Sequence, residues 1–93
     1  MKTNKAVREI MKAQKKSVGY IKDKINQRNK EMGLDTKEIK ARNITDRLAQ
    51  ENISVEKLRE MIVHLDYKIV LVPFDKKLNE GEYEIEWDTD TRE

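Results

Sequence analysis

The chain lacks cysteine altogether and has a single histidine, His64. These absences exclude disulfide frameworks and thiolate metal sites, and they argue against a transition-metal centre. The sequence also has neither a glycine-rich phosphate loop nor a nucleophile accompanied by a base and an orienting group. We therefore expect no catalytic residues, no metal and no cofactor, and we do not expect an enzyme.

Aromatic residues and long apolar runs are also scarce. Five aromatic residues and a hydrophobic content of 37% predict one small domain with a mostly aliphatic core. No apolar run approaches the roughly 18–20 residues that span a membrane. No hydrophobic stretch follows the polar N-terminus to form a signal peptide. We therefore expect a cytoplasmic protein without a membrane partner.

Charge is divided unevenly along the chain. Residues 1–47 hold fourteen basic and six acidic side chains, a net charge of +8, whereas residues 48–93 hold six basic and twelve acidic ones, a net charge of −6. Basic charge on short amphipathic helices is typical of proteins that bind duplex DNA. A solvated, lysine-rich surface has the same composition, so charge alone leaves both interpretations open.

Apolar residues recur at helical spacing in the first third of the chain. The pattern predicts a helix over residues 5–16. A second helix is expected to begin after Ser17, a suitable N-cap, and to run to about residue 32. Gly33 then stands where helices commonly end in a left-handed conformation. Gly19 weakens the first turn of this helix by roughly 1 kcal/mol relative to alanine.

Two further helical patterns lie in the middle of the chain. Ala41, Ile44 and Leu48 share one face of a helix expected within residues 41–51. Ser54 is suited to cap a following helix, which Asp66 is expected to end. The buried stripe of that helix is predicted to be Leu58, Met61, Ile62 and Leu65.

The segment between the second and third helical patterns leaves two interpretations open. Asp35 to Glu38 resembles a capping box, which would begin a helix. Ile39, however, points about 140° away from Ile44 at 100° per residue. Either the helix is broken near residues 40–43 or a separate short helix begins there, which we favour, or Ile39 is exposed for a partner.

After Asp66 the period of the apolar pattern changes from 3.6 residues to two. Residues 67–72 are rich in β-forming side chains, and residues 82–87 alternate between apolar side chains and glutamates. This pattern predicts a C-terminal β-hairpin on a mainly α fold. Residues 1–66 would form the helical core, and residues 67–93 the hairpin and an acidic tail of the same domain. The apolar hairpin face is the expected homodimer interface: Tyr83, Ile85 and Trp87.

Residues 43–72 resemble the phage-repressor (Xre or Cro-like) family of helix-turn-helix proteins. The shared features are a turn with Asn and Ser, a helix ending in Leu65-Asp66-Tyr67, where the family usually has Gly before Tyr, and a Val- and Leu-rich stretch ending at Pro73. Upstream, Ser17, Ile21 and Ile25 match the family pattern Thr-x-x-x-Leu-Ala-x-x-Leu. The resemblance implies a lambda-repressor-like helix-turn-helix bundle that regulates transcription, as a repressor of phage or mobile-element type.

The chain departs from that family in three places. Lys22 stands where the family prefers a small Ala, and Val18 stands where a Gln often touches phosphate. Between Ile25 and Ile44 the chain is about a dozen residues longer than the family's short turn requires. The stretch of residues 27–42 therefore widens the DNA footprint, forms a surface for another protein, or adds its apolar residues to the core.

Groove geometry identifies candidate DNA contacts. The major groove admits one helix, and residues near the N-terminus of that helix reach base edges. With Ile44 and Leu48 facing the core, the predicted base contacts are Arg42, Asn43, Thr45, Asp46 and Arg47. If Asn43 does not read a base, it caps a shortened helix that starts at Ile44. The predicted phosphate contacts are Lys15, Lys16, Ser17, Lys37, Lys40 and Asn52.

The expected partner is double-stranded DNA, bound by a homodimer on two half-sites with the acidic hairpins directed away from the duplex. The alternative is a protein-binding module on the same scaffold, such as a phage-encoded inhibitor of a host defence system or an antitoxin-like partner. That module would use the glutamate row Glu82, Glu84 and Glu86 to bind a basic protein.

Overall fold

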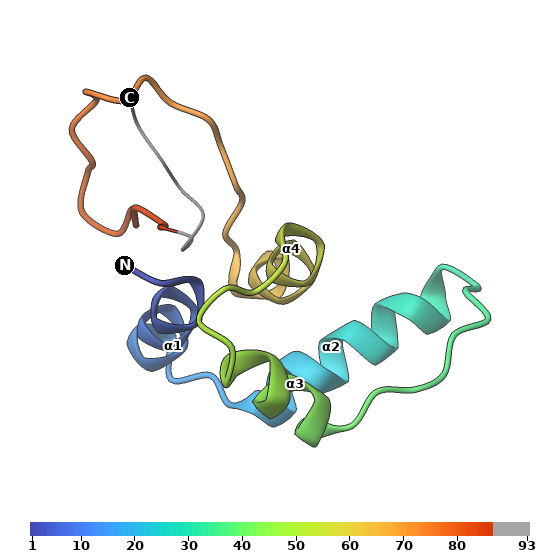
Figure 1. The fold of residues 1–93 in the computed structure, drawn as a ribbon. Coiled ribbons are helices and arrows are strands. Elements are labelled where there is room, and N and C mark those ends of the chain that lie inside the picture. Colours follow the sequence, from blue (N-terminus) through green and yellow to red (C-terminus); the bar gives the residue numbers. More distant parts are fainter. Residues whose placement is uncertain (87–93) are drawn as a thin grey trace.

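The computed structural model describes residues 1–86, which fold as four α-helices followed by one short 3₁₀ helix (Figure 1). The elements are α1 (Thr3–Gln14), α2 (Val18–Glu31), α3 (Ala41–Leu48), α4 (Val55–Ile62) and η1 (Val63–Leu65). The predicted fold class is consistent with the structure only in being helical, and the lambda-repressor-like arrangement of the helices stays a prediction. The predicted β-hairpin is wrong, because no residue between 67 and 86 lies in a strand.

Both ends of α2 form as their local chemistry predicts. The backbone N–H of Tyr20 donates to Ser17 Oγ at 3.1 Å, so Ser17 is the N-cap. At the other end Gly33 adopts φ +66°, a left-handed conformation that glycine takes without strain. The N–H of Gly33 donates to Lys30 O at 3.1 Å, and the N–H of Leu34 donates to Asn29 O at 3.0 Å. This pair of bonds is a Schellman cap, and it ends the helix at the predicted place.

The last helix also begins and ends where its cap residues predict. Ser54 Oγ accepts from the N–H of Lys57 at 3.3 Å. After η1, Asp66 takes φ +62°, and the N–H of Tyr67 donates back to Ile62 O at 3.0 Å. Asp is among the few residues that tolerate this left-handed position, so it terminates the helix in place of glycine.

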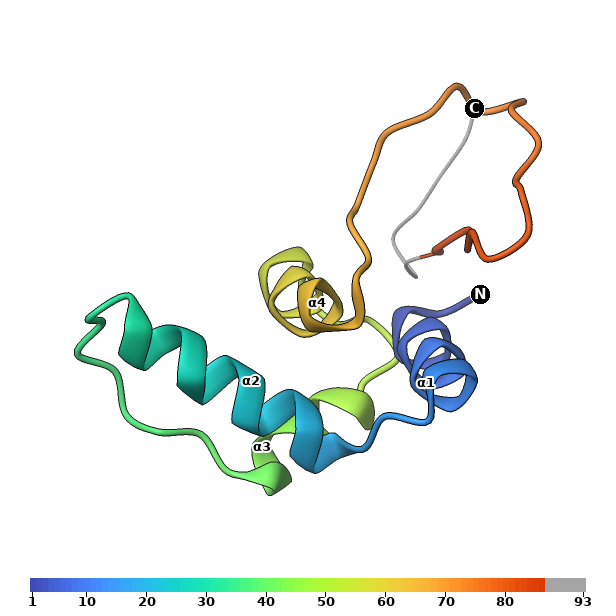
Figure 2. The same cartoon turned by 180° about the vertical axis from the view of Figure 1, so that it is seen from behind.

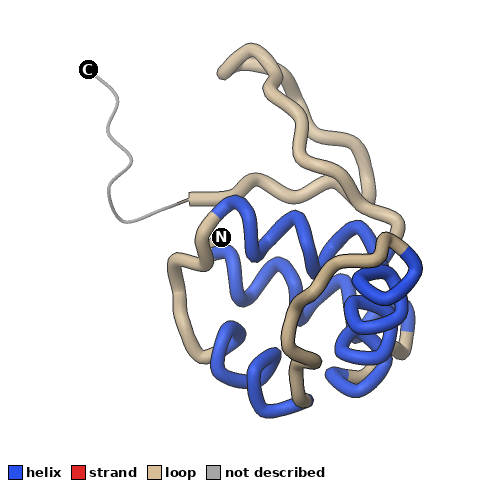
Figure 3. The backbone as a smooth tube through the Cα atoms, turned by 90° about the vertical axis from the view of Figure 1, so that its right-hand side faces the viewer, coloured by secondary structure: helices blue, strands red, loops and turns tan. Residues whose placement is uncertain are grey.

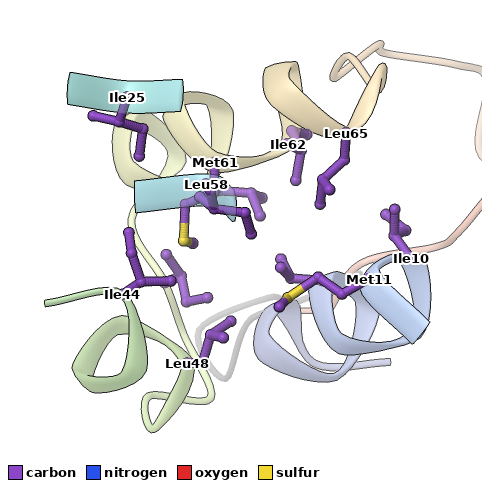
Figure 4. Packing of buried hydrophobic residues seen from close by; sticks show 12 residues of the cluster. Ile10, Met11, Ile25, Ile44, Leu48, Leu58, Met61, Ile62 and Leu65 are labelled. Atoms are coloured by element: carbon purple, nitrogen blue, oxygen red, sulfur yellow. The ribbon is translucent and has the colours of Figure 1, made fainter. Parts of the chain in front are cut away.

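The four helices and η1 enclose one aliphatic core (Figure 4). The predicted stripe of α4 and η1 is buried, and it meets apolar side chains from the other three helices. The core cluster comprises Val7, Ile10, Met11, Ile21, Ile25, Ile44, Leu48, Ile53, Leu58, Met61, Ile62 and Leu65. Because Ile44 and Leu48 are among them, the core fixes which face of α3 points inward.

The start of α1 anchors the chain that follows α3. Thr3 is fully buried; its Oγ1 donates to Glu51 O at 2.6 Å and accepts from the N–H of Ile53 at 2.8 Å. Asn4 and Arg8 each donate a side-chain N–H to Leu48 O at 3.1 Å. Carbonyls at a helix C-terminus need such donors. One helix thus holds the C-terminal end of α3 and the turn behind it.

Residues 67–86, called the arm from here on, extend from the helices without forming the predicted hairpin (Figure 3). Its two halves meet through side chains: Tyr67 Oη donates to Gly81 O at 2.7 Å, and the rings of Tyr67 and Tyr83 lie 6.1 Å apart. Among the described residues, no backbone hydrogen bond joins residues 67–72 to residues 82–86. Instead the N–H of Glu86 donates to Met1 O at 2.9 Å.

The failure of the hairpin prediction has a physical reason. Alternating apolar and polar residues show that a segment has two different faces, but a strand also needs a second backbone in register. The long connection between the two halves leaves that register unspecified, and an isolated two-stranded hairpin is marginal in water. Of the predicted dimer residues, Tyr83 and Ile85 are half-buried, and Trp87 lies outside the described residues.

Candidate nucleic-acid interface

The outer part of the arm lies far from α3, with α1 and α4 between them (Figures 1 and 2). The last residues of the arm return to the start of α1, where the N–H of Glu86 donates to Met1 O. Ile44 and Leu48 are 0% and 1% exposed, so they form the inner face of α3. Arg42 and Asp46 point outward; their side chains are 89% and 66% exposed, and Arg42 Nε lies 3.9 Å from Asp46 Oδ2. An ion pair this exposed contributes little to stability, so both groups remain accessible to another molecule.

The first turn of α3 is organised by Asn43. Its Oδ1 accepts from the backbone N–H of Lys40 at 2.7 Å, while its own N–H donates to Lys40 O at 2.9 Å. Asn43 is therefore the third residue of a helix that starts at Ala41 with Lys40 as its N-cap, and the interpretation in which Asn43 caps a helix starting at Ile44 is wrong. The residue is exposed, and its side-chain NH₂ group retains two donors for an outside acceptor.

The approach to α3 is held by Asn26 of α2. Asn26 Nδ2 donates to Ile39 O, and Asn26 Oδ1 accepts from the N–H of Ile39, both at 2.9 Å. Ile39 is half-buried against the core. No helix is broken near residues 40–43, because residues 34–40 form no helix and the apparent capping box at Asp35 begins none; α3 is instead a separate short helix that starts at Ala41.

The inserted stretch contributes little to the core. Met32 and Leu34 are 57% and 48% exposed. Of the apolar residues proposed to complete the core, only Ile39 packs against it. Lys37 and Lys40 are exposed on the stretch that leads into α3. They are therefore close in sequence to the residues on the outward face of that helix.

Arg47 differs from the other four predicted base contacts. Its Nη1 lies 2.6 Å from Glu60 Oε1 of α4, and its side chain is only 15% exposed. This bond ties α3 to α4 and directs the guanidinium away from open solvent. Thr45 is exposed, and its hydroxyl donates to Ala41 O at 3.3 Å within the helix. The structure therefore gathers Arg42, Asn43, Thr45 and Asp46 on the outward side and separates Arg47 from them.

The predicted phosphate contacts fall into two groups. Lys15, Lys16 and Ser17 form the α1–α2 connection, in which Lys15 takes φ +56° and Lys16 Nζ lies 4.3 Å from the centre of the Tyr20 ring. The second group surrounds α3: Lys37, Lys40 and Asn52, all exposed. Neither α2 nor α3 has an acidic residue in its first turn, so the positive ends of both helix dipoles remain uncompensated.

Two side chains away from α3 have shifted pKa values. A side-chain hydrogen bond with Asp23 raises the pKa of Lys22, whose Nζ lies 2.6 Å from Asp23 Oδ1. Burial, with a smaller contribution from the nearby charge of Arg28, lowers the pKa of His64. His64 Nε2 is buried with no hydrogen-bond partner among the described residues. Neither shift concerns the outward face of α3.

The predicted acidic row is partly occupied by local contacts. Glu82 Oε1 accepts from the N–H of Asn79 at 2.7 Å, and Glu86 Oε2 lies 3.6 Å from the N-terminal ammonium group. Glu84 is exposed. The three glutamates therefore do not form one continuous free acidic face.

Sequence reasoning missed the residues that position α3. Asn26, Glu60, Asn4 and Arg8 make no pattern in the sequence, since each acts on a residue at least thirteen positions away. The only available signal was a polar residue, such as Asn26, on a helix whose core-facing and solvent-facing positions are already occupied by other residues.

Comparison with protein-family models, curated proteins and solved structures found no match to this chain. Among residues 1–86 there is no helix that combines the length and apolar character needed to cross a membrane. The same residues contain no group of three or more acidic or histidine side chains placed to hold a metal ion.

Proposed function

We propose that this chain binds double-stranded DNA with sequence preference and regulates transcription, with α3 as the helix that enters the major groove. The observation that carries the proposal is the arrangement of α3. Ile44 and Leu48 fix its inner face in the core, and Arg42, Asn43, Thr45 and Asp46 occupy its other sides. A short, outward-facing helix with a rigid back is what groove recognition requires.

Each outward side chain suits a known type of base contact. The Arg42 guanidinium matches the O6 and N7 acceptors of guanine, and the free NH₂ group of Asn43 donates to an acceptor such as adenine N7. The Asp46 carboxylate accepts from cytosine N4. Arg47 takes a different role, because its bond to Glu60 holds the orientation of α3 against α4. It is a positioning residue in this proposal.

Phosphate contacts would come from both sides of α3. Lys37 and Lys40 precede the helix, and Lys15, Lys16 and Ser17 stand at the N-terminus of α2, whose dipole attracts anions. The acidic end of the arm lies beside the start of α1, where the N–H of Glu86 donates to Met1 O at 2.9 Å (Figure 1). That the regulator represses, and is of phage or mobile-element type, rests on the sequence resemblance alone.

The test is fluorescence anisotropy with random-sequence duplex across about 50–200 mM salt, followed by selection from a randomised duplex pool. We expect weak binding that falls steeply with salt, and a selected motif in which Arg42→Ala relaxes the preference at one base pair. Lys40→Ala should reduce the slope of log affinity against log salt by about 1. Lys77→Ala, which removes the same charge from the arm, is the matched control and should leave that slope unchanged.

The alternative, a protein-binding module, predicts the reverse pattern. Under it, Glu82→Gln and Glu84→Gln abolish function and Lys40→Ala does not. Absence of any salt-sensitive duplex binding at about 50 mM salt would exclude the DNA proposal.

A further inference from the structure

A pocket separates the C-terminal half of α2 from helix α4, η1 and the start of the arm. Its volume is about 630 Å³, which is within the range of about 300–1,000 Å³ found for sites that bind small molecules. Its walls come from three parts of the chain, within residues 25–34, 56–64 and 67–69. No residue of α3 lines the pocket, so it is distinct from the proposed DNA-binding face.

Apolar side chains that the core leaves uncovered line this pocket. Met32 and Leu34 are 57% and 48% exposed, and Val63 and Ile69 are 43% and 39% exposed. The end of α2 extends past the other helices, which leaves Met32 and Leu34 without a helix to pack against (Figures 1 and 2). This aliphatic surface is suited to the apolar part of a ligand.

The cap of α2 explains why Leu34 is exposed. In a Schellman cap the residue after the glycine commonly packs against an apolar side chain at the third or fourth position from the helix end. Asn29 and Arg28 occupy those two positions, so the helix offers Leu34 no apolar partner. Leu34 lines the pocket instead.

Positive charge predominates at the same pocket. The charged side chains that line it are Arg28, Glu56, Arg59, Glu60 and Lys68. None of the three cations forms an ion pair with another described residue. Glu60, by contrast, is bonded to Arg47 at 2.6 Å, so the three cations face one uncompensated carboxylate. The pocket therefore attracts an anion.

We propose that this pocket binds a small organic anion with an apolar part. The guanidinium groups of Arg28 and Arg59 hold the anionic group, because each presents paired N–H donors that match a carboxylate or a phosphate. The apolar part packs on Leu34 and Met32, and the flexible thioether side chain of Met32 adapts to its shape. The inference goes beyond the proposed function, since the site binds its ligand whether or not α3 binds duplex.

His64 reports directly on the occupancy of the pocket. It lines the pocket and is the single histidine of the chain, so the NMR signal of its imidazole is unambiguous. Its Nε2 is buried without a hydrogen-bond partner among the described residues. Because that nitrogen is covered, the ring serves as part of the wall and does not hold the anion.

The test is a titration of the full chain with octanoate at about pH 7.5, followed by the His64 signal. We expect a saturable shift with half-saturation at about 1 mM or below. Acetate has the charge without the chain, and octylammonium has the same chain with the opposite charge, so each should bind at least about tenfold more weakly. No saturable shift up to about 10 mM octanoate, or equal binding of octylammonium, overturns the proposal.

Two variants separate the charge from the apolar wall. Arg28→Gln combined with Arg59→Gln should weaken octanoate about tenfold and remove its preference over octylammonium. Leu34→Ser should weaken octanoate and octylammonium alike, because it removes apolar contact from both. Lys76→Gln is the control, since Lys76 is exposed on the arm but does not line this pocket. A double glutamine variant that binds octanoate like the control contradicts the proposal.

The changed side chains are all exposed, so we expect each variant to keep the helical circular dichroism of the wild type. If the double glutamine variant unfolds, Arg28→Lys combined with Arg59→Lys replaces it. That variant keeps both charges and should still prefer octanoate to octylammonium; loss of the preference contradicts the proposal.

Two further measurements complete the test. Comparison of octanoate with octyl phosphate identifies the anionic group, and saturable binding of either supports the site. Duplex binding of the same samples separates the two proposals. Saturable octanoate binding without salt-sensitive DNA binding refutes the proposed function and leaves the pocket assigned, whereas DNA binding without a His64 shift does the reverse.

Discussion

The helical part of the chain, residues 3–65, and the arm contain similar apolar side chains but bury them very differently. In the helices, Val7, Ile21 and Leu65 are completely covered, whereas in the arm Leu71 is 98% and Phe74 69% exposed. The helices cover one another because each presents an apolar face to a neighbour. In the arm, Tyr67 and Tyr83 contact each other and pack against the core, whereas Val70 and Leu71 remain exposed. The difference shows that burial is decided by the available partner surface as much as by the residue.

The two regions also differ in how their backbones are satisfied. Helices pair their backbone groups internally, and their ends here are completed by Ser17, Gly33 and Ser54. The arm is held by a few bonds, such as that from Tyr67 to Gly81. Regions with few buried contacts and open backbone groups are the first to open locally. We therefore expect the arm to exchange its amide hydrogens well before the helices.

The largest effect that tests this comparison is expected from replacing leucine by alanine at two positions. Leu48 is 1% exposed and Leu71 is 98% exposed. Leu48→Ala should lower the free energy of unfolding by about 2–5 kcal/mol, because it removes buried methyl groups and leaves a cavity. Leu71→Ala should change it by no more than about 0.5 kcal/mol when the chain is dilute enough to be monomeric. Urea denaturation followed by circular dichroism measures both, and similar losses would show that the arm is packed as tightly as the core.

A smaller effect is expected at the buried polar contact between α1 and the turn before α4. Thr3→Val preserves the shape of the side chain but removes the bonds to Glu51 O and Ile53 N–H. We expect a loss of about 1–3 kcal/mol in the free energy of unfolding. Thr3→Ser keeps the hydroxyl and serves as the control. If Ser proved more harmful than Val in the same denaturation assay, the methyl group and not the hydrogen bonds would hold this end of α1.

The two ends of α2 sharpen the comparison, because they test whether local backbone rules govern the helical part. Gly19 lies in the helix, where an added Cβ would meet only Ser17 Oγ at 3.7 Å, so Gly19→Ala should stabilise by about 1 kcal/mol. Gly33 has φ +66°, so Gly33→Ala should destabilise by about 1 kcal/mol even in open space. The Tm should therefore rise for Gly19→Ala and fall for Gly33→Ala. Shifts of the same sign would contradict the interpretation that local backbone rules govern the helical part.

The elements that could be predicted are those set by neighbouring residues. Ser17 and Ser54 were identified as caps, and Gly33 and Asp66 as helix ends, because each acts on backbone groups within a few positions. The hairpin could not be predicted in this way. The alternating pattern is a property of each segment alone. A hairpin also needs backbone hydrogen bonds between the two segments, and residues 67–72 and 82–86 form none with each other.

The same distinction applies to the candidate site. The phase of Ile44 and Leu48 identifies the outward residues of α3, and Arg42 and Asp46 lie there. Arg47 lies about 60° from Ile44 at 100° per residue, on the flank of the helix. Its direction is therefore decided by Glu60, a residue of another helix that the sequence does not place beside it.

The smallest expected effect concerns the junction of the two regions, where His64 of η1 packs between α2 and the start of the arm. Its pocket of about 630 Å³ is lined by Arg28 and Glu60 as well as Tyr67. Burial favours the neutral imidazole and lowers the pKa of His64, with Arg28 and Lys24 acting in the same direction and Glu60 opposing them. The folded chain therefore binds this proton less readily than the unfolded chain.

The sign of the pH dependence follows from that difference. Above the ordinary histidine pKa both states are neutral, and His64 has no effect on stability. As the pH falls, the unfolded chain takes up the proton first, so stability decreases until the pH has passed the lowered pKa of the folded state. We expect the Tm of the wild type to fall between about pH 7 and pH 5 more steeply than that of His64→Gln, which cannot titrate. If the Tm of the wild type and of His64→Gln fell in parallel, the imidazole would be hydrated in the folded chain. The well-packed region would then end before η1 and not after it.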